Sequence, residues 1–418
     1  MRVTNEIFDK RLKTMHAARD YIRVHEAGLV EACIRSGLTE GGAKLDIGLM
    51  YKQMMNLELD RDRLVGKEVG EGTVLAAMIP FDVPNFMVPF YCGTAYLAGK
   101  NVVMRFGEVT KPIGAQWKRA FDETKAPAIK IEEAMDGPKF GEWAIEDDAV
   151  RHLILAGGVK VLKAYTKRDV AECFDSIVIS GPTRPKAIID ASAKPMLKYA
   201  IETIVRAAYY GSGQLCAFEK EVIPAPEVYD ETKRLLIEEV QEVDYGSPQN
   251  TVGPLGDKWV IIGLAAMYDR IKGDPKYNIL VGGGYDCDKG IFEPTLVEAP
   301  DGVEDDIHYF GPLVFLNGAA RKGMTPAEVA CSDTVHGGYA YAWTPDISRG
   351  LWYEGVLKQD FGTVRINGNI LNELFDWPFG GFKKSFIALR REEAGMMEYH
   401  GRVHHSYILT GITKSPGS

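Results

Sequence analysis

The chain has 418 residues, 46% of them hydrophobic and 26% charged, and 49 Lys and Arg against 58 Asp and Glu give a formal net charge of -9. At roughly 100–200 residues per domain, this length predicts two or three globular domains. The acidic balance argues against a nucleic-acid partner, because phosphate contacts need clustered cations. The sequence has no polybasic run and no apolar stretch of about 18 residues, so we expect no membrane partner.

The six cysteines are scattered, without a Cys-x-x-Cys pair or a cysteine–histidine cluster at zinc spacing. This usage is typical of a reduced protein without disulfides, and it predicts no metal centre. The N-terminal residues are charged throughout and lack the apolar core of a secretory signal. We therefore expect a cytoplasmic protein.

Residues 1–65 carry helical periodicity and many charges. After them, short apolar runs alternate with helical segments along the rest of the chain. The runs fall at 74–79, 101–104, 152–155, 176–179, 187–189, 221–223, 279–281, 313–316, 339–343 and 363–366. Continuous apolar runs separated by helical stretches are typical of parallel sheets covered on both faces, so the chain is predicted to be α/β throughout.

One cysteine follows a helical stripe and a glycine-rich break. The stripe runs from Ala193 to Tyr210, Gly211 and Gly213 end it, and Cys216 comes three residues later. A thiol just after such a break could open into a cleft, and the thiolate form of cysteine is a nucleophile. Taken alone, however, a free cysteine is more often a small buried hydrophobe.

Two other segments stand out by their glycines. Leu-Ala-Gly-Gly-Val-Lys, with Gly157 and Gly158 at its centre, is an apolar strand, a tight turn and a helix start, where a ligand can approach the backbone. It does not match the dinucleotide fingerprint Gly-x-Gly-x-x-Gly, and a plain tight turn is the simpler explanation. The segment 377–385, Trp-Pro-Phe-Gly-Gly-Phe-Lys-Lys-Ser, is a stiff turn with apolar flanks.

Together, the order and spacing of these segments resemble the aldehyde dehydrogenase superfamily over about residues 70–405. Residues 213–216 match the nucleophile motif Gly-Gln-x-Cys, which implies that Cys216 is the catalytic nucleophile. Residues 310–312 match the motif Phe-Gly-Pro. All of the matching segments are 73–84, 98–105, 213–216, 310–312, 343–346 and 378–385.

The resemblance implies an aldehyde dehydrogenase-like fold, with two doubly wound open-sheet domains and an oligomerisation tail. We expect a nicotinamide-cofactor-binding domain over 1–189 and a catalytic domain over 190–383, with Cys216 in the cleft between them. Residues 384–418 would be a return segment, in which 403–412 forms a strand that adds to the sheet of a partner. A homodimer or homotetramer is expected.

One segment bears on which branch of the superfamily the chain resembles. Hydrolytic members have a glutamate that activates water, and aligning Pro185 with their motif puts Ile179 at that position. An isoleucine cannot accept a proton, so an acyl-enzyme would have no obvious general base for hydrolysis. Residues 179–190, and the run 216–223 with Glu219, are instead similar to the CoA-acylating aldehyde dehydrogenases.

This similarity implies NAD(P)-dependent reduction of an acyl thioester, carried by CoA or an acyl carrier, to an aldehyde through an acyl-enzyme on Cys216. The reverse acylating oxidation would use the same intermediates. Two alternatives stay open. One is a non-acylating aldehyde dehydrogenase that makes a carboxylic acid with a substitute base, and the other is a catalytically impaired family member with a binding role.

The resemblance also implies a cofactor site. Arg105 stands where the family has a ribose-contacting lysine, and Glu108 matches an acidic position near the adenosine ribose. A carboxylate accepts from a ribose hydroxyl and repels a 2′-phosphate, so we expect NAD, with NADP as the alternative. Gly157 and Gly158 would form the turn near the adenine–pyrophosphate half, and Phe310 would contact the cofactor.

Two positions depart from the family pattern. Asp82 stands where the family has a catalytic asparagine, whose amide donates to the developing oxyanion. An ionised aspartate has no proton to donate, and it becomes a donor only if burial raises its pKa strongly. Asn85, three residues on, is the alternative if the register is shifted. His308 replaces a glutamate that contacts the nicotinamide ribose.

Overall fold

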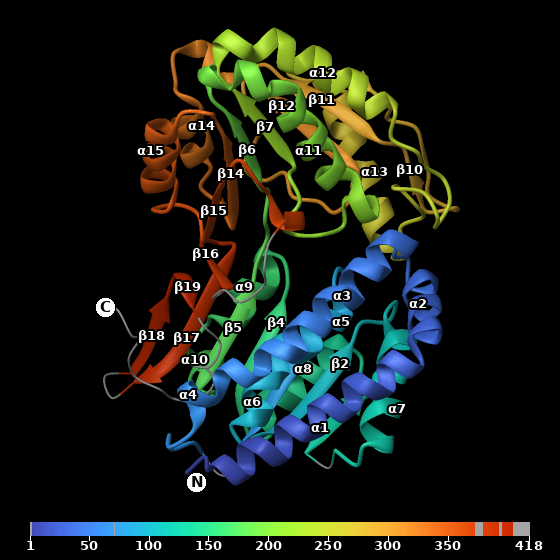
Figure 1. The fold of residues 1–418 in the computed structure, drawn as a ribbon, viewed down its shortest axis with the longest axis vertical. Coiled ribbons are helices and arrows are strands. Elements are labelled where there is room, and N and C mark those ends of the chain that lie inside the picture. Colours follow the sequence, from blue (N-terminus) through green and yellow to red (C-terminus); the bar gives the residue numbers. More distant parts are fainter. Residues whose placement is uncertain (1, 71, 127, 373–378, 393–394, 404–418) are drawn as a thin grey trace.

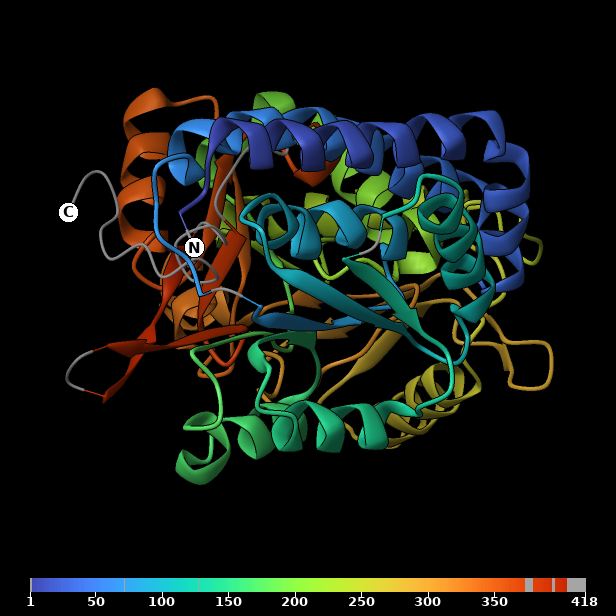
Figure 2. The same ribbon diagram turned by 90° about the horizontal axis from the view of Figure 1, so that it is seen from below.

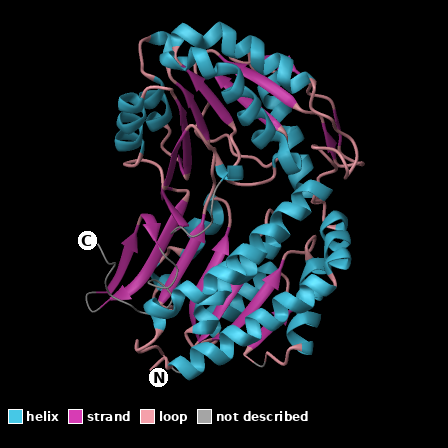
Figure 3. Cartoon of the chain, in the orientation of Figure 1, coloured by secondary structure: helices cyan, strands magenta, loops and turns pink. Residues whose placement is uncertain are grey.

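The computed structural model describes residues 2–70, 72–126, 128–372, 379–392 and 395–403. Two seven-stranded sheets, each covered by helices, occupy the lower and upper halves of Figure 1. Figure 3 shows the same view by element type, with strands in both halves flanked by helices. The α/β prediction is therefore confirmed, and each apolar run predicted as a strand lies in one of the two sheets.

The first sheet has the strand order β18-β17-β5-β4-β1-β2-β3. Strands β1 to β5 pair in parallel, whereas β17 and β18 add at one edge in antiparallel fashion. The central strands are largely buried, as their continuous apolar sequences predict. The bounds are β1 Val74–Ile79, β2 Asn101–Phe106, β3 Ile129–Glu132, β4 Val150–Ala156, β5 Ser176–Ser180, β17 Phe386–Glu392 and β18 Gly395–Tyr399.

Helices cover both faces of the first sheet. In Figure 2 the blue helices α1 to α3 lie on one side of it, and the green helices α8 to α10 lie on the other. Helix α1 begins at the Thr4 cap, whose side chain accepts from the Ile7 N–H, and it buries a stripe that includes Phe8, Leu12 and Met15. The helices are α1 Asn5–Val24, α2 Glu26–Arg35, α3 Glu40–Asn56, α4 Arg61–Leu64, α5 Pro84–Met87, α6 Thr94–Leu97, α7 Lys111–Glu123, α8 Gly137–Glu146, α9 Val159–Tyr165 and α10 Arg168–Ala171.

The second sheet has the order β15-β14-β6-β7-β12-β11-β8, and β8 is its antiparallel edge strand. Helix α11 begins at Leu197, later than the predicted start at Ala193, because Pro195 lacks an N–H and the chain makes a 3₁₀ turn there. The strands are β6 Lys186–Ile189, β7 Glu221–Pro224, β8 Asn278–Val281, β11 Thr295–Ala299, β12 Leu313–Asn317, β14 Tyr339–Trp343 and β15 Thr363–Ile366. The helices are α11 Leu197–Tyr209, α12 Tyr229–Gln241, α13 Lys258–Lys272, α14 Pro326–Ser332 and α15 Ile347–Leu357.

The chain changes sheets between Ser180, where β5 ends, and Lys186, where β6 begins. This lies a few residues before the expected domain boundary at 189, because β6 pairs with β7 and β14 of the second sheet. After β15 the chain returns through a small sheet of β13 (His336–Gly337), β16 (Phe379–Lys383) and β19 (Gly401–Val403).

The C-terminal return segment contributes strands β17 and β18 to the first sheet. The strand expected over 403–412 lies outside the described residues, apart from its first residue. In the part of the chain that the structure describes, no helix is both long and apolar enough to cross a membrane.

Candidate active site

Cys216 lies just after a turn whose residues adopt left-handed backbone conformations. Helix α11 ends at Tyr209, and the next turn has positive φ angles at Gly211 (58°), Ser212 (61°) and Gly213 (61°). A Cβ on Gly213 would lie 2.5 Å from the Gly311 carbonyl oxygen, so only glycine fits there. The Ser212 hydroxyl accepts from the Gly253 N–H at 2.9 Å, which holds the one non-glycine residue of this turn in its unfavourable conformation.

Three side-chain donors, from Thr183, Tyr341 and Lys220, hold the loop of Cys216 in place. Thr183 donates to the carbonyl oxygen of Cys216 at 2.6 Å, and Tyr341 donates to the next carbonyl, of Ala217, at 2.7 Å. The Lys220 ammonium bridges the carbonyl oxygens of Gly213 and Gly311, at 2.6 and 2.8 Å. The nucleophile loop is thereby tied to the loop that carries Phe310.

A cavity of about 180 Å³ opens where the carboxyl ends of β1, β4 and β5 face this loop. It brings together Cys216, Asp82, Phe310 and the turn of Gly157 and Gly158, all predicted from the sequence. The whole lining is Pro80, Phe81, Asp82, Met87, Tyr91, Ala156, Gly157, Gly158, Ser180, Gly181, Thr183, Cys216, His308, Phe310 and Ser385.

Asp82 lines the same cavity as Cys216, and the backbone N–H and thiol of Cys216 both act on its carboxyl. Burial raises the pKa of Asp82 above its ordinary value, although the N–H groups of Cys216 and Val83 oppose this rise. Burial, and then the nearby Asp82 carboxyl, raise the pKa of the Cys216 thiol well above its ordinary value. At rest the thiol is neutral, and a carboxylate with a raised pKa stands ready to take its proton.

Asn85 does not line this cavity. It is fully buried beneath the N-terminal helices, where its amide nitrogen donates to Asp46 at 2.7 Å and its amide oxygen accepts from the Trp117 indole at 3.0 Å. The same Asp46 carboxyl accepts from the backbone N–H of Asn85 at 3.0 Å. The structure therefore gives no support to a shifted register, and Asp82 is the residue that faces the thiol.

Ile179 does not face the cavity either. It is 0% exposed and packs in the core beneath helices α8 to α10, whereas the next residue, Ser180, lines the cavity. The expectation that Ile179 occupies the place of a water-activating glutamate is therefore corrected, because strand alternation turns its side chain to the other face of β5. Ser180 instead hydrogen-bonds with Tyr91, with 3.1 Å between their hydroxyl oxygens.

His308 lines the cavity beside Phe310, with their ring centroids 5.6 Å apart. Burial, and then the neighbouring His336, lower the pKa of His308 to about 4. A ring nitrogen of His308 lies 3.2 Å from the carbonyl oxygen of Thr183. The histidine is therefore neutral at physiological pH and donates one N–H to that carbonyl.

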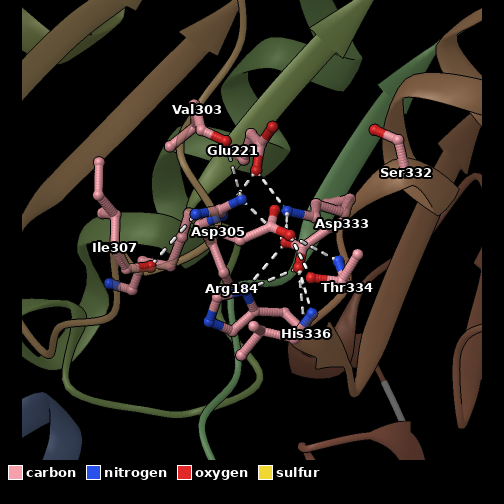
Figure 4. A network of polar contacts seen from close by, with 12 residues as sticks. Arg184, Glu221, Val303, Asp305, Ile307, Ser332, Asp333, Thr334 and His336 are labelled. Carbon is pink, nitrogen blue, oxygen red and sulfur yellow. Dashed lines mark hydrogen bonds and ion pairs between the residues drawn. The ribbon is translucent and has the colours of Figure 1, made fainter.

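An ion network holds the loop 303–308 from behind (Figure 4). Arg184 donates to three backbone carbonyls of this loop. Arg184 and Lys186 both pair with the carboxylates of Glu221 and Asp333, and all four side chains are at most 3% exposed. The pairing balances two cations against two carboxylates, so loss of one member would leave a buried uncompensated charge.

Arg105 and Glu108 lie at and just beyond the carboxyl end of β2, outside the cavity lining. Arg105 donates to Glu108 at 2.7 Å, and Lys111 pairs with the other oxygen of Glu108 at 2.6 Å. Lys111 and Arg105 together lower the pKa of Glu108, so it stays ionised. This end of the sheet thus presents one carboxylate between two cations.

Sequence reasoning missed one residue that faces the nucleophile. The Tyr339 hydroxyl acts on the Cys216 thiol and lowers its pKa in part, against the larger rise that burial causes. Tyr339 opens strand β14, and its only sequence signal was the alternation of aromatic residues with alanines in Tyr-Ala-Tyr-Ala-Trp. That pattern predicts a buried strand and does not indicate which loop the strand faces.

The chain is thus a two-domain α/β protein. Its cavity holds a cysteine with a carboxylate beside it, an arrangement suited to thiol chemistry. A family model described as "Aldehyde dehydrogenase family" matches residues 50–403. The chain belongs to the aldehyde dehydrogenase family.

Curated relatives are distant. The chain is 25% identical over 349 residues to mitochondrial succinate-semialdehyde dehydrogenase of Arabidopsis thaliana, covering 81% of this chain and 64% of that protein. It is 23% identical over 353 residues to 1-pyrroline-5-carboxylate dehydrogenase of Staphylococcus saprophyticus, covering 80% and 65%. The chain thus spans slightly less than two thirds of the length of these relatives.

Solved structures share the fold. A betaine aldehyde dehydrogenase double mutant from Staphylococcus aureus, in complex with NAD+ and with a modified cysteine, has a TM-score of 0.80 at 20% identity and covers 98% of this chain and 86% of its own. An NAD-dependent aldehyde dehydrogenase from Sinorhizobium meliloti has a TM-score of 0.81 at 18% identity and covers 98% and 84%. The aldehyde dehydrogenase-like fold expected from the sequence is confirmed.

Proposed function

We propose that the protein oxidises an aldehyde to a carboxylic acid with NAD+, through a thioester on Cys216, and that Asp82 is the general base. The observation that carries this proposal is the Asp82 carboxyl in the same cavity as the Cys216 thiol. The sequence alone favoured reduction of an acyl thioester because no base was evident, and Asp82 removes that objection.

The residues at the cleft fit a dinucleotide. A Cβ added at Gly158 would meet no atom within 4 Å, so this turn presents backbone to open space, as a pyrophosphate requires. Arg105 and Glu108 would hold the adenosine ribose, and Phe310 would flank the nicotinamide end. When bound, NAD+ supplies the acceptor for the hydride that leaves the substrate carbon.

Asp82 acts in both halves of the proposed reaction. In the first, the carboxylate takes the thiol proton as the sulfur of Cys216 attacks the aldehyde carbon, and loss of hydride from that carbon leaves a thioester. Asp82 then releases the thiol proton to solvent. In the second half, Asp82 takes a proton from water, whose oxygen attacks the thioester carbonyl, and passes it to the departing sulfur. General-base help of this kind is worth about 10²–10⁴-fold in rate.

The names of the relatives also favour oxidation. Both curated relatives are named as dehydrogenases of an aldehyde or a carboxylate, without mention of CoA. The CoA-acylating reaction is the second candidate, because no glutamate is among the described residues that line the cavity. In that reaction a CoA thiol, and not water, would discharge the thioester on Cys216.

The test supplies purified protein with NAD+ and a panel of aldehydes, with and without free CoA, and identifies the product by mass spectrometry. We expect free acid, formed at the same rate with or without CoA. Product that forms only with CoA, and as an acyl-CoA, would reject hydrolysis and favour the second candidate. Cys216→Ser serves as the control, because a serine hydroxyl is far less ionised than a thiol and should abolish either reaction.

A further inference from the structure

The turn that carries Asp82 is held between the first sheet and the N-terminal helices. Strand β1 ends at Ile79, where it pairs with β2, and helix α5 begins at Pro84. Only residues 80–83 separate the two elements, so the position of Asp82 depends on how firmly both ends are fixed. The sheet fixes the first end. At the second end, α5 packs against helix α3 (Figure 1).

Helix α5 takes its cap from α3. Its own N-cap residue, Val83, has an apolar side chain that cannot accept from the first N–H groups of the helix. Asp46 of α3 supplies the acceptors instead. Its Oδ1 accepts from the backbone N–H of Phe86 at 2.8 Å, and its Oδ2 accepts from the backbone N–H of Asn85 at 3.0 Å. The side-chain amide of Asn85 also donates to Oδ2, at 2.7 Å. Asp46 is 0% exposed, so water does not compete for these bonds.

We propose that Asp46 is a positioning residue for Asp82, and that it acts by capping the helix that follows the catalytic turn. The inference rests on the proposed role of Asp82 as general base. The Asp82 carboxyl accepts from the Val83 N–H at 3.1 Å, so it is fixed to the same turn that leads into the capped helix. A displacement of a reacting group by about 1 Å can cost about 10²-fold in rate.

The position of Asp46 in the chain adds to the interest of this role. The family model matches residues 50–403, and Asp46 precedes them. The helices before residue 50 would then do more than cover one face of the first sheet. They would also hold the turn from which the base reaches the thiol of Cys216.

The test is a double-mutant cycle of Asp46→Asn and Asp82→Ala, read as kcat/KM for NADH formation from an aldehyde. Free CoA is present, so that either fate of the thioester is open. Asparagine keeps the size of the Asp46 side chain but replaces one acceptor oxygen with an NH2 group, which cannot accept. We expect Asp46→Asn to lower kcat/KM by about 10²-fold when Asp82 is present. In Asp82→Ala it should cost less than about threefold, because no carboxyl is left to position.

The cycle separates positioning from general damage. A purely structural role would lower activity by the same factor in both backgrounds, and that result would overturn the proposal, as would wild-type activity of Asp46→Asn. The matched control is Asn85→Ala, which removes an amide bonded to Asp46 but leaves both backbone N–H groups of the cap. It should stay within about threefold of wild type, and a loss as large as that in Asp46→Asn would count against the proposal.

A backbone substitution guards against a folding defect in Asp46→Asn. Phenyllactic acid in place of Phe86 turns the N–H that donates to Asp46 into an ester oxygen and leaves every side chain in place. We expect kcat/KM to fall in the same direction as in Asp46→Asn. An ester-containing enzyme as active as wild type would overturn the role of this bond.

Failure of this inference can be told apart from failure of the proposed function. If Asp82→Ala is as active as wild type, Asp82 is not the base, and both proposals fall. If Asp82→Ala is impaired while Asp46→Asn is not, the base stands and only the positioning role of Asp46 is rejected.

Discussion

Replacing Glu219 by glutamine is expected to stabilise the protein at neutral pH and to flatten the dependence of its stability on pH. Glu219 is 0% exposed, and neither of its carboxyl oxygens has a well-formed hydrogen bond among the described residues. Burial raises its pKa from 4.5 to about 8, and a weak contact with the Asn369 amide does not offset this rise. The ionised form is therefore much less favourable in the folded chain than in the unfolded one.

The sign and size follow from this difference. The pKa of Glu219 is higher in the folded chain than in the unfolded one. The free energy of unfolding is therefore undiminished by Glu219 below about pH 4.5 and falls as the pH rises through about 8. At about 1.4 kcal/mol per pKa unit, the whole loss is about 5 kcal/mol, of which about 3 kcal/mol has occurred by pH 7. Glutamine stays neutral, so Glu219→Gln should escape this loss.

The assay is equilibrium urea unfolding of wild type and Glu219→Gln at several pH values between about 5 and 8.5. The matched control is Glu221→Gln, two residues on and equally buried. Although burial opposes it, Lys186 and Arg184 lower the pKa of Glu221, so its removal should destabilise the fold by about 3–5 kcal/mol at neutral pH. Parallel stability curves for wild type and Glu219→Gln would refute the reasoning.

Three further changes test the site. Asp82→Asn should lower kcat/KM by about 10²–10⁴-fold and remove the acid limb of its pH profile, and a variant as active as wild type would exclude Asp82 as the base. Glu108→Gln should raise the NADP to NAD ratio of kcat/KM by at least about tenfold, since Arg105 and Lys111 then face a 2′-phosphate without a competing carboxylate; an unchanged ratio would separate this residue from the ribose. Ile179→Glu should cost about 3–5 kcal/mol in urea unfolding and give no faster acid release, because the new carboxyl enters the core behind β5; faster release would put that side chain in the cleft after all.

Apolar runs were enough to predict the fold, because a strand buried on both faces must be apolar along its whole length. β1 shows why: its sequence, Val-Leu-Ala-Ala-Met-Ile, has no polar side chain, and four of its six residues are buried. The return of β17 onto β5 was not predicted. β17 and β5 lie far apart in the chain, and the sequence of β17 does not indicate which strand it pairs with.

The site was predictable where glycines and cysteine fix a motif, as at Gly213 and Cys216, and less so where packing decides which way a side chain points. Ile179 was assigned to the cleft by counting back from Pro185, but its strand turns it into the core. Tyr339 was missed because only the packing of β14 against the nucleophile loop, where Tyr341 donates to Ala217, brings it near Cys216.

Two features at the reacting thiol are best understood as one relocation of the base: Asp82 stands where the family has an asparagine, and no glutamate among the described residues faces the cavity from β5. A glutamate facing the cavity from β5, together with Asp82, would put two carboxylates beside one thiol, and like charges would push both pKa values upward until one lost its charge. With only Asp82 facing the sulfur, a single carboxylate can serve both proton transfers. The cost is the amide donor that an asparagine would have offered to the oxyanion at that position. On this argument a chain with Asp82→Asn regains an amide donor but has no base. Because Asp82 takes a proton in both halves of the proposed reaction, Asp82→Asn should slow the formation of the acyl-enzyme as well as its hydrolysis. An acyl-enzyme that forms at the wild-type rate and then accumulates would confine Asp82 to the hydrolytic half.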